Sequence, residues 1–113
     1  MEKTTLGLEE NIEALLAYAV FFISGITLLV LEKENKFVHF HALQSTLAFL
    51  ILFSIHIVLF PLLYVPFLNI LVYIVYYVLD VVSIVVWIVC MFQAYKGERY
   101  KLPIIGNIIE RTL

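Results

Sequence analysis

The sequence predicts an all-α integral membrane protein, a three-helix transmembrane bundle followed by an amphipathic helix at the membrane interface. Three apolar runs carry this prediction, at about residues 14–31, 40–60 and 67–95, and each is almost free of charge. A helix needs roughly 20 residues to cross the hydrocarbon core of a bilayer. The composition agrees, because 64% of the residues are hydrophobic and 14% are charged, against about 45–50% and about 25% in soluble domains.

The bulk composition also limits the classes of protein to consider. At 113 residues the chain has room for one domain, residues 1–113. The net charge is −2 and no basic patch with interleaved aromatics occurs, which argues against a nucleic-acid partner. Cys90 is the only cysteine, so an intrachain disulfide and a cysteine metal site are excluded.

The first span follows a short polar lead. Glu9, Glu10 and Glu13 stand where a signal peptide would carry positive charge, so the run reads as a span rather than a cleaved signal. Small residues in its second half, Gly25 between Ser24 and Thr27, would let another helix approach closely and could support self-association.

The second and third spans are joined by a short apolar hairpin. Pro61 is expected to end the second span, because proline cannot continue the backbone hydrogen bonds of a helix. The third run would be about 43 Å long as one helix, longer than the ~30 Å hydrocarbon layer. Four spans, with residues 67–95 split near Asp80, are the alternative. No Gly or Pro lies inside the run, which favours one helix.

Residues 103–112 are predicted to form a short helix in the membrane interface. Pro103 suits a first helical turn, and Ile105, Ile108 and Ile109 share one face. With three spans the chain ends would lie on opposite sides of the membrane. Six of the seven Lys and Arg then fall on the C-terminal side, which predicts a cytoplasmic C-terminus and an external N-terminus.

Polar residues within the spans gather in one predicted layer, in the half of the bilayer nearer the cytoplasm. Asp80 is the only acid there, and it either handles a proton or substrate or fixes helix packing through hydrogen bonds. His56 is expected near the outer end of the second span, too far from Asp80 to pair with it, unless the third span extends beyond the membrane on the outer side, which would bring the two level. The predicted layer consists of Asp80, Ser83, Ser24, Thr27, Gln44, Ser45 and Thr46.

Two segments carry a family resemblance. Residues 37–44 read Phe-x-x-Phe-His-Ala-x-Gln, and residues 94–103 read Ala-Tyr-x-Gly-Glu-x-Tyr-x-x-Pro. Together they resemble a family of small prokaryotic membrane proteins related to the twenty-kilodalton (Tic-twenty-like) subunit of the chloroplast import translocon. The resemblance implies an all-helical bundle in the cell membrane of a prokaryote, with a translocation role in the chloroplast branch.

The same motifs predict a patch at the inner face of the membrane, which would be either a partner site or a structural latch. Its residues are Phe37, Phe40, His41, Gln44, Tyr95, Gly97, Glu98, Tyr100 and Pro103. His41 or Gln44 is expected to meet Glu98 or Tyr100.

The sequence favours a non-enzymatic protein that acts as a homo-oligomer or as a subunit of a membrane complex. No nucleophile–base arrangement, paired carboxylates or phosphate loop is present, and no cofactor is expected. His39 and His41 are two residues apart and face different sides of a helix, which is not a metal-ligand spacing. The alternative is an oligomeric channel or transporter that uses Asp80 and the polar layer.

Overall fold

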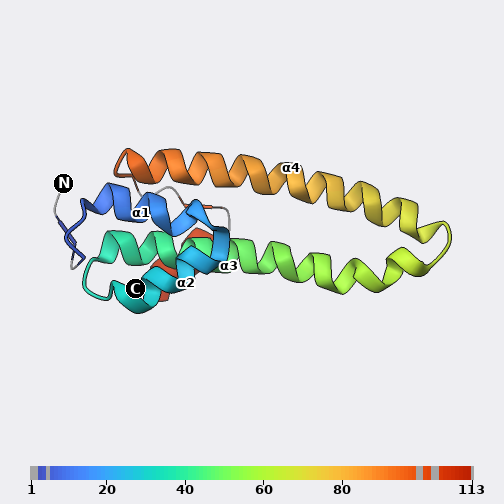
Figure 1. Cartoon of the computed structure of the whole chain (residues 1–113), viewed down its shortest axis with the longest axis horizontal. Coiled ribbons are helices and arrows are strands. Elements are labelled where there is room, and N and C mark those ends of the chain that lie inside the picture. The colour runs from blue at the N-terminus through green and yellow to red at the C-terminus, as the bar shows by residue number, and fades with distance from the viewer. Residues whose placement is uncertain (1–2, 5, 99–100, 103–104, 113) are drawn as a thin grey trace.

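The computed structural model describes residues 3–4, 6–98, 101–102 and 105–112, and these are largely helical. Figure 1 shows two long antiparallel helices with two short helices packed beside one half of them. The molecule is elongated, measuring 54 × 24 × 23 Å. The elements in chain order are α1 (Glu10–Ala19), α2 (Phe21–Leu31), α3 (Lys36–Leu59), the 3-10 helix η1 (Phe60–Tyr64), α4 (Leu68–Tyr95) and α5 (Ile105–Thr112).

The predicted first span is not one helix. The chain breaks at Val20 (φ −118°, ψ 43°) and at Phe21, whose φ of 53° is in the left-handed region. α2 turns back beside α1, so that the start of α1 and the end of α2 lie at the same end of the molecule (Figure 1). Each arm has 10 or 11 residues and is about 15 Å long, which is about half of the hydrocarbon layer.

Gly25 is where α2 comes closest to α3. A Cβ atom on Gly25 would lie 2.7 Å from Thr46 Oγ1 and 3.0 Å from the carbonyl oxygen of Ala42. Small residues allow two backbones to approach in this way. Gly25 was expected to support contact between chains. It is instead used inside this chain, where it lets α2 pack closely against α3.

The hairpin also changes where the chain ends lie. Both termini are at the same end of the bundle, together with the connection between α2 and α3 (Figure 1). This arrangement differs from the prediction of ends on opposite sides of a membrane, which counted the first apolar run as a full crossing. We call this end of the molecule the charged end, since between Lys36 and Lys96 the only formally charged residue is Asp80.

α4 runs without interruption from Leu68 to Tyr95, so the prediction of one long helix is confirmed and the split near Asp80 is not seen. Pro61 acts differently from the prediction. It sits in the first turn of η1, where its missing N–H breaks no hydrogen bond. The helical path therefore continues to Tyr64, and the tight hairpin expected from residue 61 begins later.

Two segments are long and apolar enough to cross a membrane, the 29 residues Lys36–Tyr64 and the 28 residues Leu68–Tyr95. Their large apolar side chains face outward, with Phe67 87% and Val58 73% exposed. A water-soluble protein would turn such surfaces inward, whereas lipid favours them. In place of the predicted three-helix bundle, the described residues contain two segments long enough to cross a membrane and a helical hairpin whose arms are about half that length.

α5 lies within the predicted range of residues 103–112, of which 103 and 104 are outside the described residues. α5 is amphipathic, but part of its apolar side packs against the protein and does not face the membrane interface. Ile109 is buried and Ile105 packs against the core cluster that contains Phe37 and Val38 of α3. The bundle therefore covers part of the face that was predicted to enter the membrane interface.

Candidate functional site

The break between α1 and α2 exposes backbone groups that a continuous helix would satisfy. Ser24 serves two of them. Its Oγ accepts a hydrogen bond from the Val20 N–H at 3.0 Å and lies 3.0 Å from the Ala17 carbonyl oxygen, to which it donates. An unsatisfied backbone group in hydrocarbon costs several kcal/mol, so Ser24 allows the chain to turn inside the membrane.

Two further side chains reach the same break from α3 and α4. Trp87 Nε1 donates to the Tyr18 carbonyl oxygen at 2.7 Å, and Ser45 Oγ donates to the Phe21 carbonyl oxygen at 2.7 Å. These bonds connect the hairpin tip to both long helices. Ser45, predicted as a member of a polar layer, is thus a backbone anchor. Trp87 donates its indole N–H to the backbone of the hairpin.

A second polar cluster ties the C-terminal segment to the bundle. Gln44 Nε2 donates to the Tyr18 hydroxyl at 3.0 Å, and that hydroxyl lies 2.7 Å from His41 Nδ1. His41 Nε2 lies 3.0 Å from the carbonyl oxygen of Glu98, and the Leu102 N–H donates to Gln44 Oε1 at 2.9 Å. Since a carbonyl only accepts, Nε2 carries the proton, and Nδ1 is left to accept from Tyr18.

The rest of the predicted inner-face patch surrounds this cluster only in part. Phe37 and Phe40 pack edge-on against His41, with ring centroids 4.7 and 5.3 Å away. Gly97 has a φ of 81°, which suits glycine at the end of α4, whereas the Tyr95 side chain is exposed. Tyr100 and Pro103 lie outside the described residues. The buried part of the patch thus has the geometry of a latch.

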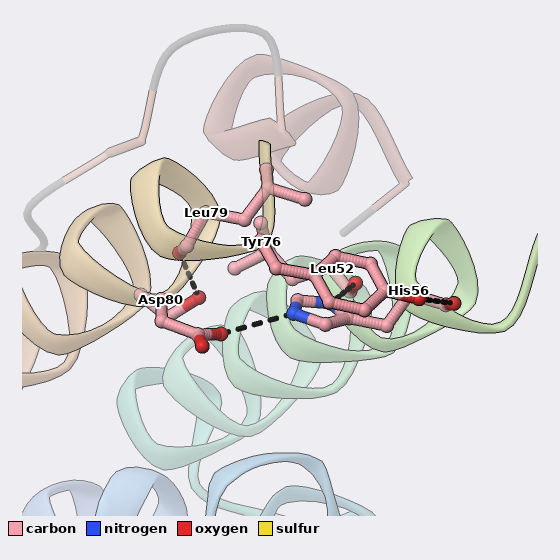
Figure 2. Close-up of polar contacts among 6 residues, drawn as sticks. Leu52, His56, Tyr76, Leu79 and Asp80 are labelled. Atoms are coloured by element: carbon pink, nitrogen blue, oxygen red, sulfur yellow. Dashed lines mark hydrogen bonds and ion pairs between the residues drawn. The ribbon is translucent and has the colours of Figure 1, made fainter. Parts of the chain in front are cut away.

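The other polar site lies between α3 and α4, away from the charged end. Figure 2 shows the His56 ring between Asp80 on one side and Leu52 on its own helix. His56 Nε2 lies 2.9 Å from Asp80 Oδ1, and Nδ1 lies 2.8 Å from the Leu52 carbonyl oxygen. Tyr76 stacks on the His56 ring at 4.6 Å and donates its hydroxyl proton to the His56 carbonyl oxygen at 2.6 Å.

The prediction that His56 and Asp80 are too far apart to pair was wrong, and η1 explains the error. The sequence placed the turn of the chain at Pro61, which puts His56 near the outer end of its span. η1 instead carries the chain five residues further, or about 10 Å at the 3-10 rise of about 2.0 Å per residue. This extension moves the turn away from His56, which becomes level with Asp80 on the returning helix.

If α4 crosses a bilayer along its axis, Asp80 is within the hydrocarbon layer at either limit of placement. It is 12 residues from the start of the helix and 15 from its end, or about 18 and 22 Å. Because α4 exceeds the ~30 Å layer by only about 12 Å, Asp80 is at least about 6 Å inside. Its side chain is nevertheless 64% exposed, and that of His56 is 27% exposed.

The pair borders a recess of about 300 Å³ between the hairpin tip and the long helices. Its walls are mainly aromatic, and Ser83 lies beside Asp80 at its polar side. The Ser83 hydroxyl donates to the Leu79 carbonyl oxygen of its own helix at 2.7 Å. The lining residues are Phe21, Phe22, Phe49, Leu52, Phe53, His56, Asp80 and Ser83.

The single polar layer expected from the sequence is therefore not formed. Asp80 and Ser83 lie at the recess, while Ser24 and Ser45 serve the chain break and Gln44 belongs to the latch. Thr27 and Thr46 each donate to the carbonyl oxygen four residues earlier in their own helix, at 2.8 Å. His56 was missed as a partner because its depth depends on the length of η1, which no residue pattern indicated.

A group of acids lies at the charged end, beside the start of α3. Asn35 caps α3 by accepting from the Val38 N–H at 3.0 Å, and it donates to Glu10 Oε2 at 3.0 Å. Glu13 and Glu32 are both buried. Burial raises the pKa of the Glu13 carboxyl above its ordinary value of 4.5, and the nearby charge of Glu32 adds to the rise.

Comparison with known proteins identifies similar sequences over almost the whole chain. Residues 4–109 match the model of a family described as the magnetosome magnetite crystal formation protein family, MamF/MmsF. A UPF0132 membrane protein of Methanocaldococcus jannaschii is 48% identical over 98% of this chain and 94% of its own length. Another from the same organism is 42% identical over 94% of this chain and 71% of its own length.

A UPF0132 membrane protein of Archaeoglobus fulgidus is 35% identical over 94% of this chain and 97% of its own length. These relatives are named membrane proteins, in agreement with a membrane location for this chain. No solved structure matches it. The predicted relation to the Tic-twenty-like family was wrong, because the matching family is a different one, and the translocation role it implied is withdrawn.

The chain break provides a stability test. We expect Ser45→Ala to lower the free energy of unfolding by about 1 kcal/mol, because the hydrogen bond from α3 to the Phe21 carbonyl oxygen is lost while the Ser24 hydroxyl, 3.2 Å from the same oxygen, remains. Ser54→Ala is the matched control, since Ser54 Oγ donates to the carbonyl oxygen of Leu50 in its own helix at 2.8 Å. Thermal unfolding in detergent would compare the two, and equal losses would contradict the anchoring role of Ser45.

The acids at the charged end give a pH-dependent prediction. Because the folded state raises the pKa of Glu13, it binds this proton more tightly than the unfolded chain, so stability falls as pH rises from below 4.5 through the folded value. Glu13→Gln removes the cost of ionising the buried acid. We expect it to raise the unfolding temperature at neutral pH and to lose that advantage in acid. A variant destabilised at neutral pH would contradict this account.

Proposed function

Since the chain belongs to the magnetosome magnetite crystal formation protein family, MamF/MmsF, we propose that it is a small non-enzymatic membrane protein that works as an assembly of identical copies. What is carried over to this chain is the membrane-protein character, because its archaeal relatives are named only as membrane proteins. The assembly is inferred from the chain's own surface.

The observation that carries this proposal is the exposure of Asp80. A charged or strongly polar side chain in the middle of a spanning helix costs about 2.5–3.5 kcal/mol on insertion scales. Among the described residues of one chain, His56 alone bonds to the Asp80 side chain and partly compensates this cost, and 64% of that side chain remains exposed. Such residues normally face protein or a water-filled space, and a second copy would supply that cover.

The surface around Asp80 suits contact with another helix. Tyr73, Tyr77 and Ile84 follow at helical spacings of three or four residues, so they share one face of α4 with Asp80. All three are exposed. We call these four residues the Asp80 face. The hairpin ends near Trp87 and leaves this part of α4 uncovered, so association of two chains would bury both the acid and the aromatic surface.

The charged end provides an orientation for the assembly. Five described basic residues belong to segments that begin or end at this end, namely Lys3, Lys33, Lys36, Lys96 and Arg111. Basic residues are retained on the cytoplasmic side of membranes. We therefore propose that both chain ends face the cytoplasm and that η1 faces outward. This replaces the earlier prediction of an external N-terminus.

The hydroxyl groups support a non-enzymatic role. Ser24, Ser45 and Ser83 each donate to a backbone carbonyl, which leaves none of them activated by a neighbouring base as a nucleophile requires. Polar side chains that would be candidates for chemistry in a soluble enzyme are here part of the internal structure of a membrane protein.

The recess favours a second candidate, an oligomeric channel or transporter for a small solute or ion. It places one acid, one histidine and one hydroxyl beside a space of about 300 Å³ within the membrane. Intramembrane acids and histidines commonly mark solute and proton pathways. Contact between copies through the Asp80 face could join such recesses into a pathway that one chain alone does not enclose.

Cysteine crosslinking tests the assembly. In a Cys90→Ala background, Ile84→Cys lies on the Asp80 face and should form a disulfide-linked dimer in native membranes. Val82→Cys is the matched control, because Val82 is similarly exposed but lies on another face of α4. We expect the dimer yield of Ile84→Cys to exceed that of Val82→Cys several-fold. Equal yields, or no dimer with either, would contradict the proposed interface.

Solute flux tests the second candidate. Purified wild-type protein in liposomes should pass protons or small cations above the leak of empty vesicles, and Asp80→Asn should reduce that flux at least tenfold. Thr27→Val, which changes a polar residue remote from the recess, should retain it. Wild-type protein that passes neither would remove the channel hypothesis while leaving the assembly untouched.

A further inference from the structure

We propose that His56 and Asp80 form an intramembrane proton-binding site, in which the two side chains share one proton between Nε2 and Oδ1 and exchange it with water entering the recess. The proposal goes beyond assembly, since it concerns what a single chain binds. It depends on hydrogen-bond directions that the backbone imposes on the His56 ring.

The Leu52 carbonyl oxygen fixes one side of that ring. It lies 2.8 Å from His56 Nδ1, and because a carbonyl can only accept, Nδ1 must carry a proton. A neutral His56 then has a bare lone pair at Nε2. This nitrogen faces Asp80 Oδ1 at 2.9 Å, a distance typical of a hydrogen bond.

A proton must therefore lie between Nε2 and Oδ1. Either His56 is doubly protonated and faces an ionised Asp80, or neutral His56 accepts from a protonated Asp80. Both descriptions contain the same number of protons and the same net charge of zero, which is the inexpensive state in hydrocarbon. Without this proton two acceptors would face each other at 2.9 Å, and the negative charge of Asp80 would remain uncompensated.

Among the described residues around the pair, no other group competes for the shared proton. From α4, Tyr76 is the titratable neighbour, and its hydroxyl proton is already donated to the His56 carbonyl oxygen at 2.6 Å. Ser83 donates to Leu79. The wall contributed by α2 consists of Phe21 and Phe22, and α3 adds only apolar residues to His56. Among the described lining residues no lysine, arginine or second acid competes.

Release of the proton would change the packing of the long helices. In the release step the N–H or O–H bond between the pair breaks and the proton passes to a water molecule in the recess, leaving neutral His56 and ionised Asp80. The two facing acceptors must then separate or admit a cation between them. The His56 carbonyl oxygen also accepts the Tyr76 hydrogen bond, so His56 takes part in both polar contacts that join α3 to α4 near the recess.

Nuclear magnetic resonance of the full chain in lipid nanodiscs tests the proposal. ¹⁵N-labelled histidine and ¹³C-labelled aspartate would be followed over a pH series, with the His56 signal assigned by its loss in His56→Gln. Asp80 is the only aspartate in the chain, so its carboxyl signal needs no assignment. We expect His56 Nε2 and the Asp80 carboxyl to change together in one step that corresponds to one proton.

Two variants distinguish one proton shared by His56 and Asp80 from two residues that titrate independently. Asp80→Asn removes the carboxyl that shares the proton, so the His56 signal should no longer follow the wild-type step, while the His39 signal should match that of the wild type throughout the series. Ser83→Ala, which alters the recess wall alone, should retain the step. Two separate steps for His56 and Asp80, or an Asp80 carboxyl that is ionised beside a neutral His56 throughout, would overturn the proposal.

Discussion

The constraint on which this structure depends is that hydrocarbon offers no hydrogen bonds to a broken backbone. The chain turns at Val20 and Phe21, where Ser24 accepts from the Val20 N–H and Trp87 of α4 donates to the freed Tyr18 carbonyl oxygen. Ser45 of α3 adds a hydrogen bond to the carbonyl oxygen of Phe21 at the start of α2. With these hydrogen bonds, an apolar segment almost long enough for a full crossing folds into two arms of half its length. Close contact at Gly25 then keeps the second arm against α3.

The remaining architecture follows from the half-length hairpin. Near the charged end, α1 and α2 pack with α3 and α4 around a shared core, and the latch formed by Tyr18, His41 and Gln44 holds the C-terminal segment to it. Toward η1 the two long helices continue without cover. The acid of the membrane interior, Asp80, lies in this uncovered part, so the same turn that closes one half of the molecule leaves the other half with a surface and a recess suited to binding.

The sequence predicted those features that depend on composition and local periodicity, and missed those that depend on register. The absence of Gly and Pro between Phe67 and Tyr95 correctly indicated one helix, and the apolar runs indicated a membrane protein.

The break at Val20 carries no such signal, since neither Val nor Phe favours it, and the hydroxyls that stabilise it come partly from another helix. The effect of Pro61 was misjudged because proline both ends helices and begins them. That ambiguity displaced His56 relative to Asp80. The motifs marked residues that do cluster, among them His41 and Gln44, but the family inferred from them was not the one that matches.

The most direct test of the account is the side of the membrane on which each connection lies. Single cysteines at Leu6, Glu34, Tyr64 and Glu98, in a Cys90→Ala background, would be labelled in intact cells with a reagent that does not cross membranes. The account predicts that residues 6, 34 and 98 are protected together and that residue 64 is labelled from outside. Labelling of residue 6 from outside with residue 98 protected would show that the first apolar run crosses the bilayer, and would contradict the half-depth hairpin.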